Sequence, residues 1–262
     1  MSDNGNQRVA VVTGATSGIG LAVAKILAAE GMSVYICGRD QSRLDAAVKE
    51  LKDAGYDVDG STCDVTKIED IKKFVRAAVD RYGRIEVLVN NAGRSGGGLV
   101  AEHSDELWFD IINTNLNSVY LMTKEVLNVG GMLERKQGQV INIASTSGKQ
   151  GIAAGSAYSA SKHGVVGFSK SLGFELARSG ITVNAVCPGF VETPLAEHVR
   201  EFFAQQRGTS EQEVLDSFNA RIPLGRYTTP EEVAGLVQYL TTPLAASITA
   251  QAINVCGGLG NY

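Results

Sequence analysis

Three side chains in the middle of the sequence have the types and spacing that carbonyl reduction requires: Ser145, Tyr158 and Lys162. Tyr158 and Lys162 are four residues apart in a helical pattern, so their side chains should lie on one helix face. A free tyrosine has a pKa of about 10, and an adjacent ammonium group should lower that pKa by favouring the phenolate. The serine and tyrosine hydroxyls can then hydrogen-bond a carbonyl oxygen while the tyrosine delivers a proton, which is reductase chemistry.

A Tyr-x-x-x-Lys pair alone is a common pattern, which a half-buried tyrosine beside a solvated lysine also produces. A second pattern supports the reductase interpretation: an apolar run from Val9 to Val12, a glycine-rich turn from Thr13 to Gly20, and a helical pattern from Ile19 to Glu30. Dinucleotide binding uses this order, because glycines let the backbone approach the pyrophosphate and the helix N-terminus offers free N–H groups. The alternative is a turn with a purely structural role, since its Gly-x-x-x-Gly-x-Gly spacing departs from the common fingerprint.

The residues after the second predicted strand, Ser33 to Cys37, indicate which dinucleotide is bound. An acidic side chain at this point contacts the ribose 2′-hydroxyl of NAD, whereas an arginine accommodates the 2′-phosphate of NADP. Arg39 follows Gly38 here and favours NADPH. Asp40 is the counter-argument, although it is equally suited to be the N-cap of the next helix.

Charge and composition argue against several classes of function. The 262 residues are 44% hydrophobic with a net charge of −4, which argues against nucleic-acid and anionic-membrane binding. No apolar run reaches the roughly 18 residues of a membrane span, and three scattered histidines argue against a metal site. Four separated cysteines favour reduced thiols in the cytoplasm. The polar residues 1–7 predict a disordered tail rather than a signal peptide.

Apolar runs and helical patterns alternate along the whole chain, which predicts an α/β fold. Further strands are expected at 58–62, 85–89, 140–144, 182–186 and 253–255. The alternation predicts one domain over residues 1–262: a Rossmann-like, doubly wound parallel sheet of about seven strands with helices on both faces. Because ligands of such sheets bind beyond the carboxyl ends of the strands, the polar, less regular stretch at 195–221 is expected to be a substrate lid.

These motifs, together with Asn90 to Gly93, Asn115 and Pro188-Gly189, resemble the short-chain dehydrogenase/reductase family from Val9 to the last strand. The resemblance implies a catalytic tetrad of Asn115, Ser145, Tyr158 and Lys162, in which Asn115 holds a water in a proton relay to Lys162. It also implies a cofactor site, in which Thr193 fixes the carboxamide. The predicted cofactor residues are Thr13, Gly14, Thr16, Ser17, Gly18, Ile19, Gly20, Arg39, Asp64, Val65, Asn91, Ala92, Gly93, Tyr158, Lys162, Pro188, Gly189, Val191 and Thr193.

Three further stretches, Gly130 to Arg135, Ser145 to Gly151 and Cys256 to Tyr262, resemble aromatic polyketide ketoreductases of the actinorhodin type. That resemblance implies a homotetramer, NADPH as cofactor, and a poly-β-ketone substrate carried on an acyl carrier protein and reduced at its ninth carbon. Two positions depart from the pattern: Ser95 stands where a proline is expected, and Arg207 where an aromatic pocket residue is expected. These departures leave the configuration of the alcohol and the pose of the substrate open.

The predicted substrate pocket has walls on both sides of the catalytic serine. Its residues are expected to be Gly96, Gly97, Thr146, Gln150, Ile152, Phe190, Leu195, Val199 and Phe203. Two other functions remain open: a 3-oxoacyl carrier-protein reductase of fatty-acid synthesis, with the same catalytic residues and a different lid, and a dinucleotide-sensing regulator without turnover. The complete tetrad counts against the regulator, which should have lost at least one of its members.

Overall fold

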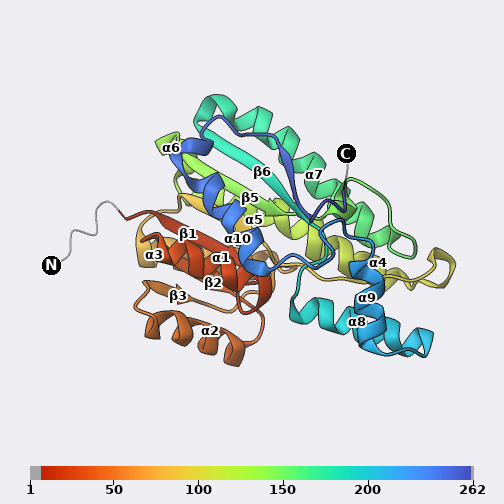
Figure 1. Ribbon diagram of the computed structural model, residues 1–262. Coiled ribbons are helices and arrows are strands. Elements are labelled where there is room, and N and C mark those ends of the chain that lie inside the picture. Colours follow the sequence, from red (N-terminus) through yellow and green to blue (C-terminus); the bar gives the residue numbers. More distant parts are fainter. Residues whose placement is uncertain (1–6, 261–262) are drawn as a thin grey trace.

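The computed structural model describes residues 7–260 and contains one parallel sheet in the strand order β3-β2-β1-β4-β5-β6-β7 (Figure 1). This arrangement confirms the predicted doubly wound, Rossmann-like sheet. Of the predicted disordered tail, residues 1–6 lie outside the described residues, and Gln7 is half-buried with its carbonyl accepting a hydrogen bond from Arg84 at 3.2 Å. The strands are β1 (Val9–Thr13), β2 (Ser33–Cys37), β3 (Val58–Gly60), β4 (Val87–Asn90), β5 (Gly138–Ile143), β6 (Ile181–Pro188) and β7 (Ala252–Val255).

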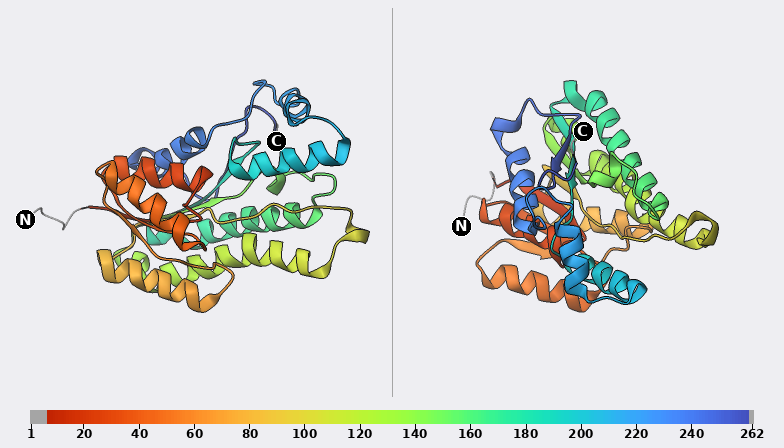
Figure 2. Two further views of the ribbon diagram at one scale, coloured as in Figure 1. Left: turned by 90° about the horizontal axis from the view of Figure 1, so that it is seen from below. Right: turned by 45° about the vertical axis from the view of Figure 1, so that its right-hand side comes forward.

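Helices cover both faces of the sheet (Figure 2). One layer contains α1 and α10, which pack against each other, and the opposite layer contains α3, α5 and α7. The helices are α1 (Gly18–Ala29), α2 (Gln41–Asp53), α3 (Ile68–Tyr82), α4 (Asp105–Ile112), α5 (Ser118–Val129), α6 (Met132–Arg135), α7 (Ser156–Leu176), α8 (Pro194–Arg207), α9 (Glu211–Asn219) and α10 (Pro230–Thr241).

Alternate residues of the central strands enter the two cores. Val12 and Ile141 belong to the core under α1 and α10, whereas Val11, Leu88 and Val140 belong to the core under α3, α5 and α7. Successive side chains of a strand point to opposite faces, so a strand buried on both faces is apolar at every position. This explains why the predicted strands appear in the sequence as continuous apolar runs.

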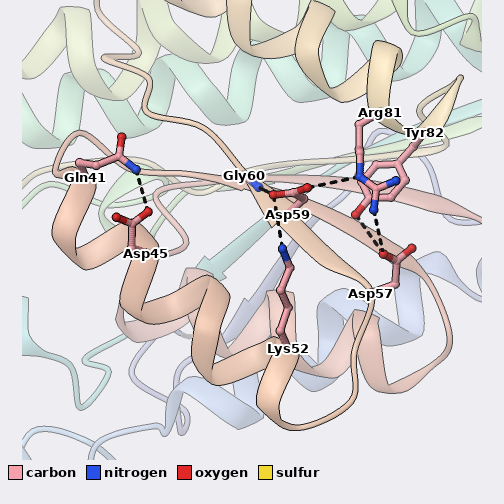
Figure 3. A network of polar contacts seen from close by, with 8 residues as sticks. All are labelled: Gln41, Asp45, Lys52, Asp57, Asp59, Gly60, Arg81 and Tyr82. Atoms are coloured by element: carbon pink, nitrogen blue, oxygen red, sulfur yellow. Dashed lines mark hydrogen bonds and ion pairs between the residues drawn. The ribbon is translucent and has the colours of Figure 1, made fainter.

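The β3 edge of the sheet is tied to its neighbouring helices by charged side chains (Figure 3). The Asp59 carboxylate lies 3.3 Å from Arg81 Nε at the end of α3 and 3.7 Å from Lys52 Nζ on α2. The Tyr82 hydroxyl donates to Asp57 at 3.3 Å. A short edge strand bordered by charges resists pairing with another sheet, and β3 ends at Gly60, two residues earlier than predicted.

The stretch predicted to be irregular, 195–221, is more regular than expected. It forms α8 and α9, separated by Gly208 in the left-handed conformation with φ of +63°. Ser210 begins α9 through a capping box with Glu213, which satisfies helix N–H groups that would otherwise lack partners. Figure 1 shows these two helices set apart from the layers of the sheet.

Candidate active site

Ser145 and Tyr158 meet beyond the carboxyl end of β5. Ser145 lies two residues after the end of the strand, and Tyr158 lies in the first turn of α7. The Ser145 hydroxyl accepts a hydrogen bond from the Ser147 amide at 3.1 Å. Burial raises the pKa of the Tyr158 phenol, and a hydrogen bond with Ser145 only partly opposes that increase. Tyr158 therefore keeps its proton at neutral pH, as a proton donor must.

Lys162 lies one turn further along α7, as the spacing predicted, and is buried with 5% of its surface exposed. Its ammonium nitrogen donates to the Ile143 carbonyl at 2.8 Å and lies 5.8 Å from the centre of the Tyr158 ring. Burial lowers the pKa of Lys162 to about 8. The predicted lowering of the Tyr158 pKa is wrong for this structure, because burial of the phenol raises that pKa and the hydrogen bond with Ser145 opposes the increase only in part.

Asn115 occupies a π-helical turn, Asn113–Asn117, between α4 and α5. Such single turns occur frequently at functional sites. Its amide nitrogen donates to the Arg94 carbonyl at 3.0 Å, and its amide oxygen accepts from the Arg94 N–H at 2.8 Å. A Cβ atom at Gly93 would lie 3.3 Å from Asn115 Oδ1 and 3.7 Å from Lys162 Nζ. Asn115 and Lys162 thus converge on Gly93, and the structure brings the predicted tetrad together.

The glycine-rich turn between β1 and α1 leaves space that only glycine permits. Gly14 and Gly18 have φ of +63° and +54°, and a Cβ atom at Gly20 would lie 2.4 Å from the Asn91 amide nitrogen. The N-cap residue of α1, Ser17, makes no side-chain hydrogen bond to the helix, so it does not occupy the first N–H groups. An anionic group is favoured at such a helix start.

The ends of β1 and β4 are joined beside this turn. The Thr13 hydroxyl accepts hydrogen bonds from the backbone N–H groups of Asn91 and Ala92, both at 3.0 Å. The Asn91 amide donates to the carbonyls of Thr13 and Gly14, also at 3.0 Å. Thr13, Asn91 and Ala92 therefore hold the turn in place through their own contacts with one another.

The segment after β6 closes the other side of the turn. Thr193 is the N-cap of α8, with its hydroxyl accepting from the Ala196 amide at 3.3 Å. A Cβ atom at Gly18 would lie 3.2 Å from the Thr193 methyl group. Gly189 donates to the Val255 carbonyl at 3.0 Å. Of the predicted cofactor residues in this segment, Thr193 thus lies against the turn, whereas Gly189 is bonded to the end of β7.

Arg39 is exposed at the end of β2, and its guanidinium makes no hydrogen bond or ion pair within residues 7–260. Asp40 instead caps α2, its carboxylate accepting from the Arg43 amide at 2.9 Å. Burial raises the pKa of Asp64, but hydrogen bonds from Thr66 and the charges of Lys67 and Arg39 lower it by more, so the net shift is downward. Arg39 is available to bind a ligand, whereas the Asp40 carboxylate already caps α2. This arrangement suits the 2′-phosphate of NADP better than the ribose 2′-hydroxyl of NAD.

These features together fit a nicotinamide dinucleotide. The turn offers a glycine-lined approach and a helix N-terminus for the pyrophosphate, and Arg39 offers a cation for a 2′-phosphate. Asp64 and the buried Val65 follow β3 beside Arg39. Within residues 7–260, no group of three or more histidine, cysteine or acidic side chains is arranged to hold a metal ion.

Two loops on the substrate side of the site contact each other. Gly98 donates to the Ala154 carbonyl at 2.8 Å, and a Cβ atom at Gly97 would lie 2.3 Å from that same oxygen. A Cβ atom at Gly96 would lie 2.7 Å from Ile111. Gly97 is thus required where the loop crosses the backbone of its neighbour, whereas Gly96 comes closest to the end of the Ile111 side chain. The other predicted wall residues differ in exposure: Thr146 is buried, Gln150 and Val199 are half-buried, and Ile152 and Leu195 are exposed.

Phe190 and Phe203 are half-buried and pack against the aromatic core of the α8–α9 segment (residues 194–219), and their place in the substrate wall stays a prediction. Phe190 stacks on Phe218 and Tyr227, with ring centres 4.9 and 5.3 Å apart. Phe203 meets Phe218 edge-on at 5.7 Å. Arg207 stands where the family resemblance predicted an aromatic pocket residue. Its guanidinium lies 5.0 Å from the Phe203 ring, so a cation covers the aromatic cluster at this position.

Several polar residues at the site were not found from the sequence. Arg200 is buried and forms a two-pronged ion pair with Glu192 at 3.1 and 2.6 Å, which ties α8 to the segment after β6. Arg94 and Ser161 bond the Asn115 side chain. Arg94 adjoins the Asn90 to Gly93 motif, and Ser161 lies inside the Tyr-x-x-x-Lys motif, but neither spacing distinguishes them from solvated residues.

A parallel Rossmann-like sheet with this tetrad and cradle defines a nicotinamide-dependent oxidoreductase, and the chain belongs to the short-chain dehydrogenase/reductase family. Residues 8–203 match the family described as short chain dehydrogenase. Within residues 7–260, none of the helices is apolar over the length that a membrane crossing needs.

Relatives with polyketide names are similar over nearly the whole chain. A protein named as ketoacyl reductase 1 of the granaticin polyketide synthase, from Streptomyces violaceoruber, is 63% identical over 97% of this chain and 93% of its own. A crystal structure of an actinorhodin polyketide ketoreductase variant with NADPH has a TM-score of 0.97 and 57% identity, covering 100% of both chains. The 3-oxoacyl-[acyl-carrier-protein] reductase FabG of Vibrio cholerae is 38% identical over 96% of this chain and 97% of its own.

Proposed function

We propose that the protein is an NADPH-dependent ketoreductase of polyketide biosynthesis. The overall reaction converts a ketone, NADPH and a proton into a secondary alcohol and NADP⁺. The observation that carries the proposal is the convergence of Ser145, Tyr158, Lys162 and Asn115 beside a dinucleotide cradle. The identity of 63% to a granaticin relative, against 38% to a fatty-acid reductase, supports the polyketide substrate.

Bound NADPH supplies hydride to the carbonyl carbon. Ser145 and Tyr158 hydrogen-bond the carbonyl oxygen, where negative charge develops as the carbon is reduced. Tyr158 donates its proton to that oxygen, and its raised pKa means that the proton is present when needed. The ammonium of Lys162 stabilises the phenolate that remains, and we assign Asn115 the water of the relay that returns a proton.

The substrate is a poly-β-ketone carried on an acyl carrier protein and reduced once, at its ninth carbon. The α8–α9 segment serves as the lid, with Leu195 and Val199 facing the substrate from one side. Ile152 and Gln150 contribute from the other side, on the loop that contacts Gly98. A bulky, partly cyclised ketone buries more apolar area between these walls than a short acyl chain does.

The assembly is a homotetramer in the cytoplasm. Phe174 on α7 and Leu244 after α10 expose 77% and 81% of their surfaces, and contact with other subunits would remove these apolar side chains from water. The four cysteines are free and buried, which suits a reducing compartment. Sedimentation at micromolar concentration should give one species of four chains, and an active monomer would contradict the assembly.

The deciding experiment adds the protein and NADPH to a minimal aromatic polyketide synthase and identifies the products by mass and NMR. A polyketide reduced at the ninth carbon is expected. Acetoacetyl carrier-protein thioesters serve as the competing substrate in a parallel assay. Unreduced polyketides together with rapid turnover of the thioesters would instead favour the fatty-acid reductase, whose relative from Vibrio cholerae is 38% identical.

A further inference from the structure

We propose that Ser161, a residue outside the tetrad, is a positioning residue that sets the orientation of Asn115 and couples it to Tyr158. This inference rests on the proposed ketone reduction, because its kinetic readout is the rate of that reaction. Ser161 lies on α7 between Tyr158 and Lys162 and is 0% exposed. Its hydroxyl makes two hydrogen bonds, one to each of two tetrad residues.

The direction of both bonds is determined by the available donors and acceptors. The Ser161 hydroxyl donates to the Tyr158 backbone carbonyl at 2.7 Å. Having used its single hydrogen, the hydroxyl oxygen can only accept from Asn115, whose amide nitrogen lies 3.1 Å away. The Asn115 amide is therefore held with its nitrogen towards Ser161.

The same orientation fixes the loop on the substrate side. With its nitrogen towards Ser161, the Asn115 amide donates to the Arg94 carbonyl at 3.0 Å and accepts from the Arg94 N–H at 2.8 Å. Arg94 begins the loop that continues through Gly96 and Gly97, and its guanidinium pairs with Asp110 on α4. A continuous set of hydrogen bonds thus connects the backbone of Tyr158 to the start of the substrate loop.

Loss of the Ser161 hydroxyl removes the fixed acceptor from a buried amide. Asn115 is 1% exposed, so its second N–H cannot turn to bulk water. The amide then gains freedom to rotate or shift, which moves Arg94 and the polar groups around Gly93. Misplacement of catalytic groups by about 1 Å can cost about 100-fold in rate, so partial loosening should lower the rate by about 10-fold.

The same helix provides a matched control. Ser169 is also 0% exposed, donates to the Val165 carbonyl at 2.7 Å, and accepts from the buried Asn142 amide at 2.8 Å. Ser169→Ala therefore removes the same pair of hydrogen bonds from a core site, away from the tetrad. Any effect of a lost buried hydroxyl on stability appears in both variants, whereas an effect on Asn115 appears only in Ser161→Ala.

The experiment measures reduction of trans-1-decalone by wild type, Ser161→Ala, Ser161→Cys, Ser169→Ala, Asn115→Ala and the Ser161→Ala/Asn115→Ala double variant. We expect kcat to fall about 10-fold in Ser161→Ala, with NADPH affinity unchanged and Ser169→Ala near the wild type. Ser161→Cys, which keeps a weak acceptor of similar size, should lie between. In the Asn115→Ala background, Ser161→Ala should add less than about 2-fold, because coupled residues are not additive.

Additive losses in the double variant, or equal losses in Ser161→Ala and Ser169→Ala, would overturn the proposal. A second measurement needs no turnover and remains valid if decalone is not a substrate. In protein labelled with ¹⁵N-asparagine, the Asn115 side-chain amide should exchange with solvent faster in Ser161→Ala than in the wild type or Ser169→Ala. Unchanged exchange would refute the positioning role, whereas a wild type inactive on every ketone would refute the proposed function alone.

Discussion

The Lys162 ammonium donates a hydrogen bond to the Ile143 backbone carbonyl at 2.8 Å, although it lies on the same helix face as Tyr158. Ile143 is the last residue of β5, and Ser145 follows two positions later. Lys162 therefore anchors α7 to the strand that precedes Ser145. The price of this position is burial, which disfavours the charged ammonium and lowers its pKa to about 8.

The first prediction concerns the alkaline limit of activity. If the charge of Lys162 is needed, kcat/KM for ketone reduction should fall as the pH rises through about 8, where the lysine loses its proton. Lys162→Arg keeps a charge throughout this range, so the alkaline decline near this pH should disappear in that variant, even if its activity is lower. A wild-type profile that stays flat to pH 9.5 would show that the charge is not required.

The lowered pKa also affects stability. Between about pH 8 and the ordinary lysine value of 10.5, the unfolded chain binds more protons at Lys162 than the folded chain does. The contribution of this residue to the free energy of unfolding therefore rises with pH in that window. Denaturant titrations at pH 8 and pH 10 on wild type and Lys162→Met should show this increase only in the wild type, once the changes common to both proteins are subtracted.

The second prediction concerns the proton donor. Tyr158→Phe removes only the hydroxyl, so the fold and NADPH binding should persist. Reduction should fall by about 100-fold or more, the usual loss for a general acid. Fluorescence titration with NADPH and the thermal unfolding curve provide the controls. Near-normal kcat in a folded Tyr158→Phe variant would mean that another group supplies the proton.

The third prediction concerns the choice of cofactor. Arg39→Ala should weaken NADPH binding by about 1.5–3 kcal/mol, the range for a hydrogen bond to a charged group, and should leave NADH binding nearly unchanged. Arg43→Ala is the matched control, because Arg43 is an exposed arginine in the first turn of α2 and the Asp40 cap uses only its backbone. Equal KM values for NADPH and NADH in the wild type would contradict the role of Arg39.

The sequence predicted the sheet and the tetrad because each has a periodic or ordered signal. Buried strands such as Val9–Thr13 are apolar at all but the last position, and Tyr158 and Lys162 are fixed by helical spacing. The ends of the strands were predicted less accurately, because β6 continues to Pro188, two residues further than predicted. Proline can end a strand because its carbonyl still accepts, although its missing N–H prevents donation.

The environment of the tetrad was not predictable in the same way. The pKa of Tyr158 depends on how much water the folded chain excludes, and no spacing in the sequence reports that quantity. Trp108 on the short helix α4 is 39% exposed, and the apolar pattern of that helix does not reveal whether such a side chain finds a partner. Phe190 likewise has the same local pattern whether it faces a substrate or stacks on Phe218.

The last prediction tests the aromatic cluster as the support of the lid. Phe218 on α9 is 5% exposed and contacts Phe190, Phe203 and the Arg207 guanidinium. Replacing a buried phenylalanine by alanine typically costs about 3–5 kcal/mol. Because the cluster lies outside the sheet's layers, Phe218→Ala should loosen α8 and α9 before the rest of the fold. The amides of α9 should exchange faster with solvent while those of β1 and β4 stay protected.

A loosened lid should raise KM for bulky ketones while NADPH affinity remains unchanged, because the cradle is formed by β1, α1 and β4. Phe202→Ala provides the control. Phe202 lies next to Phe203 on α8 and is 53% exposed. Its ring meets that of Phe203 edge-on with centres 5.6 Å apart, so replacing Phe202 by alanine removes little buried area. Faster exchange in α9 with an unchanged KM for decalone would show that these helices do not cover the substrate.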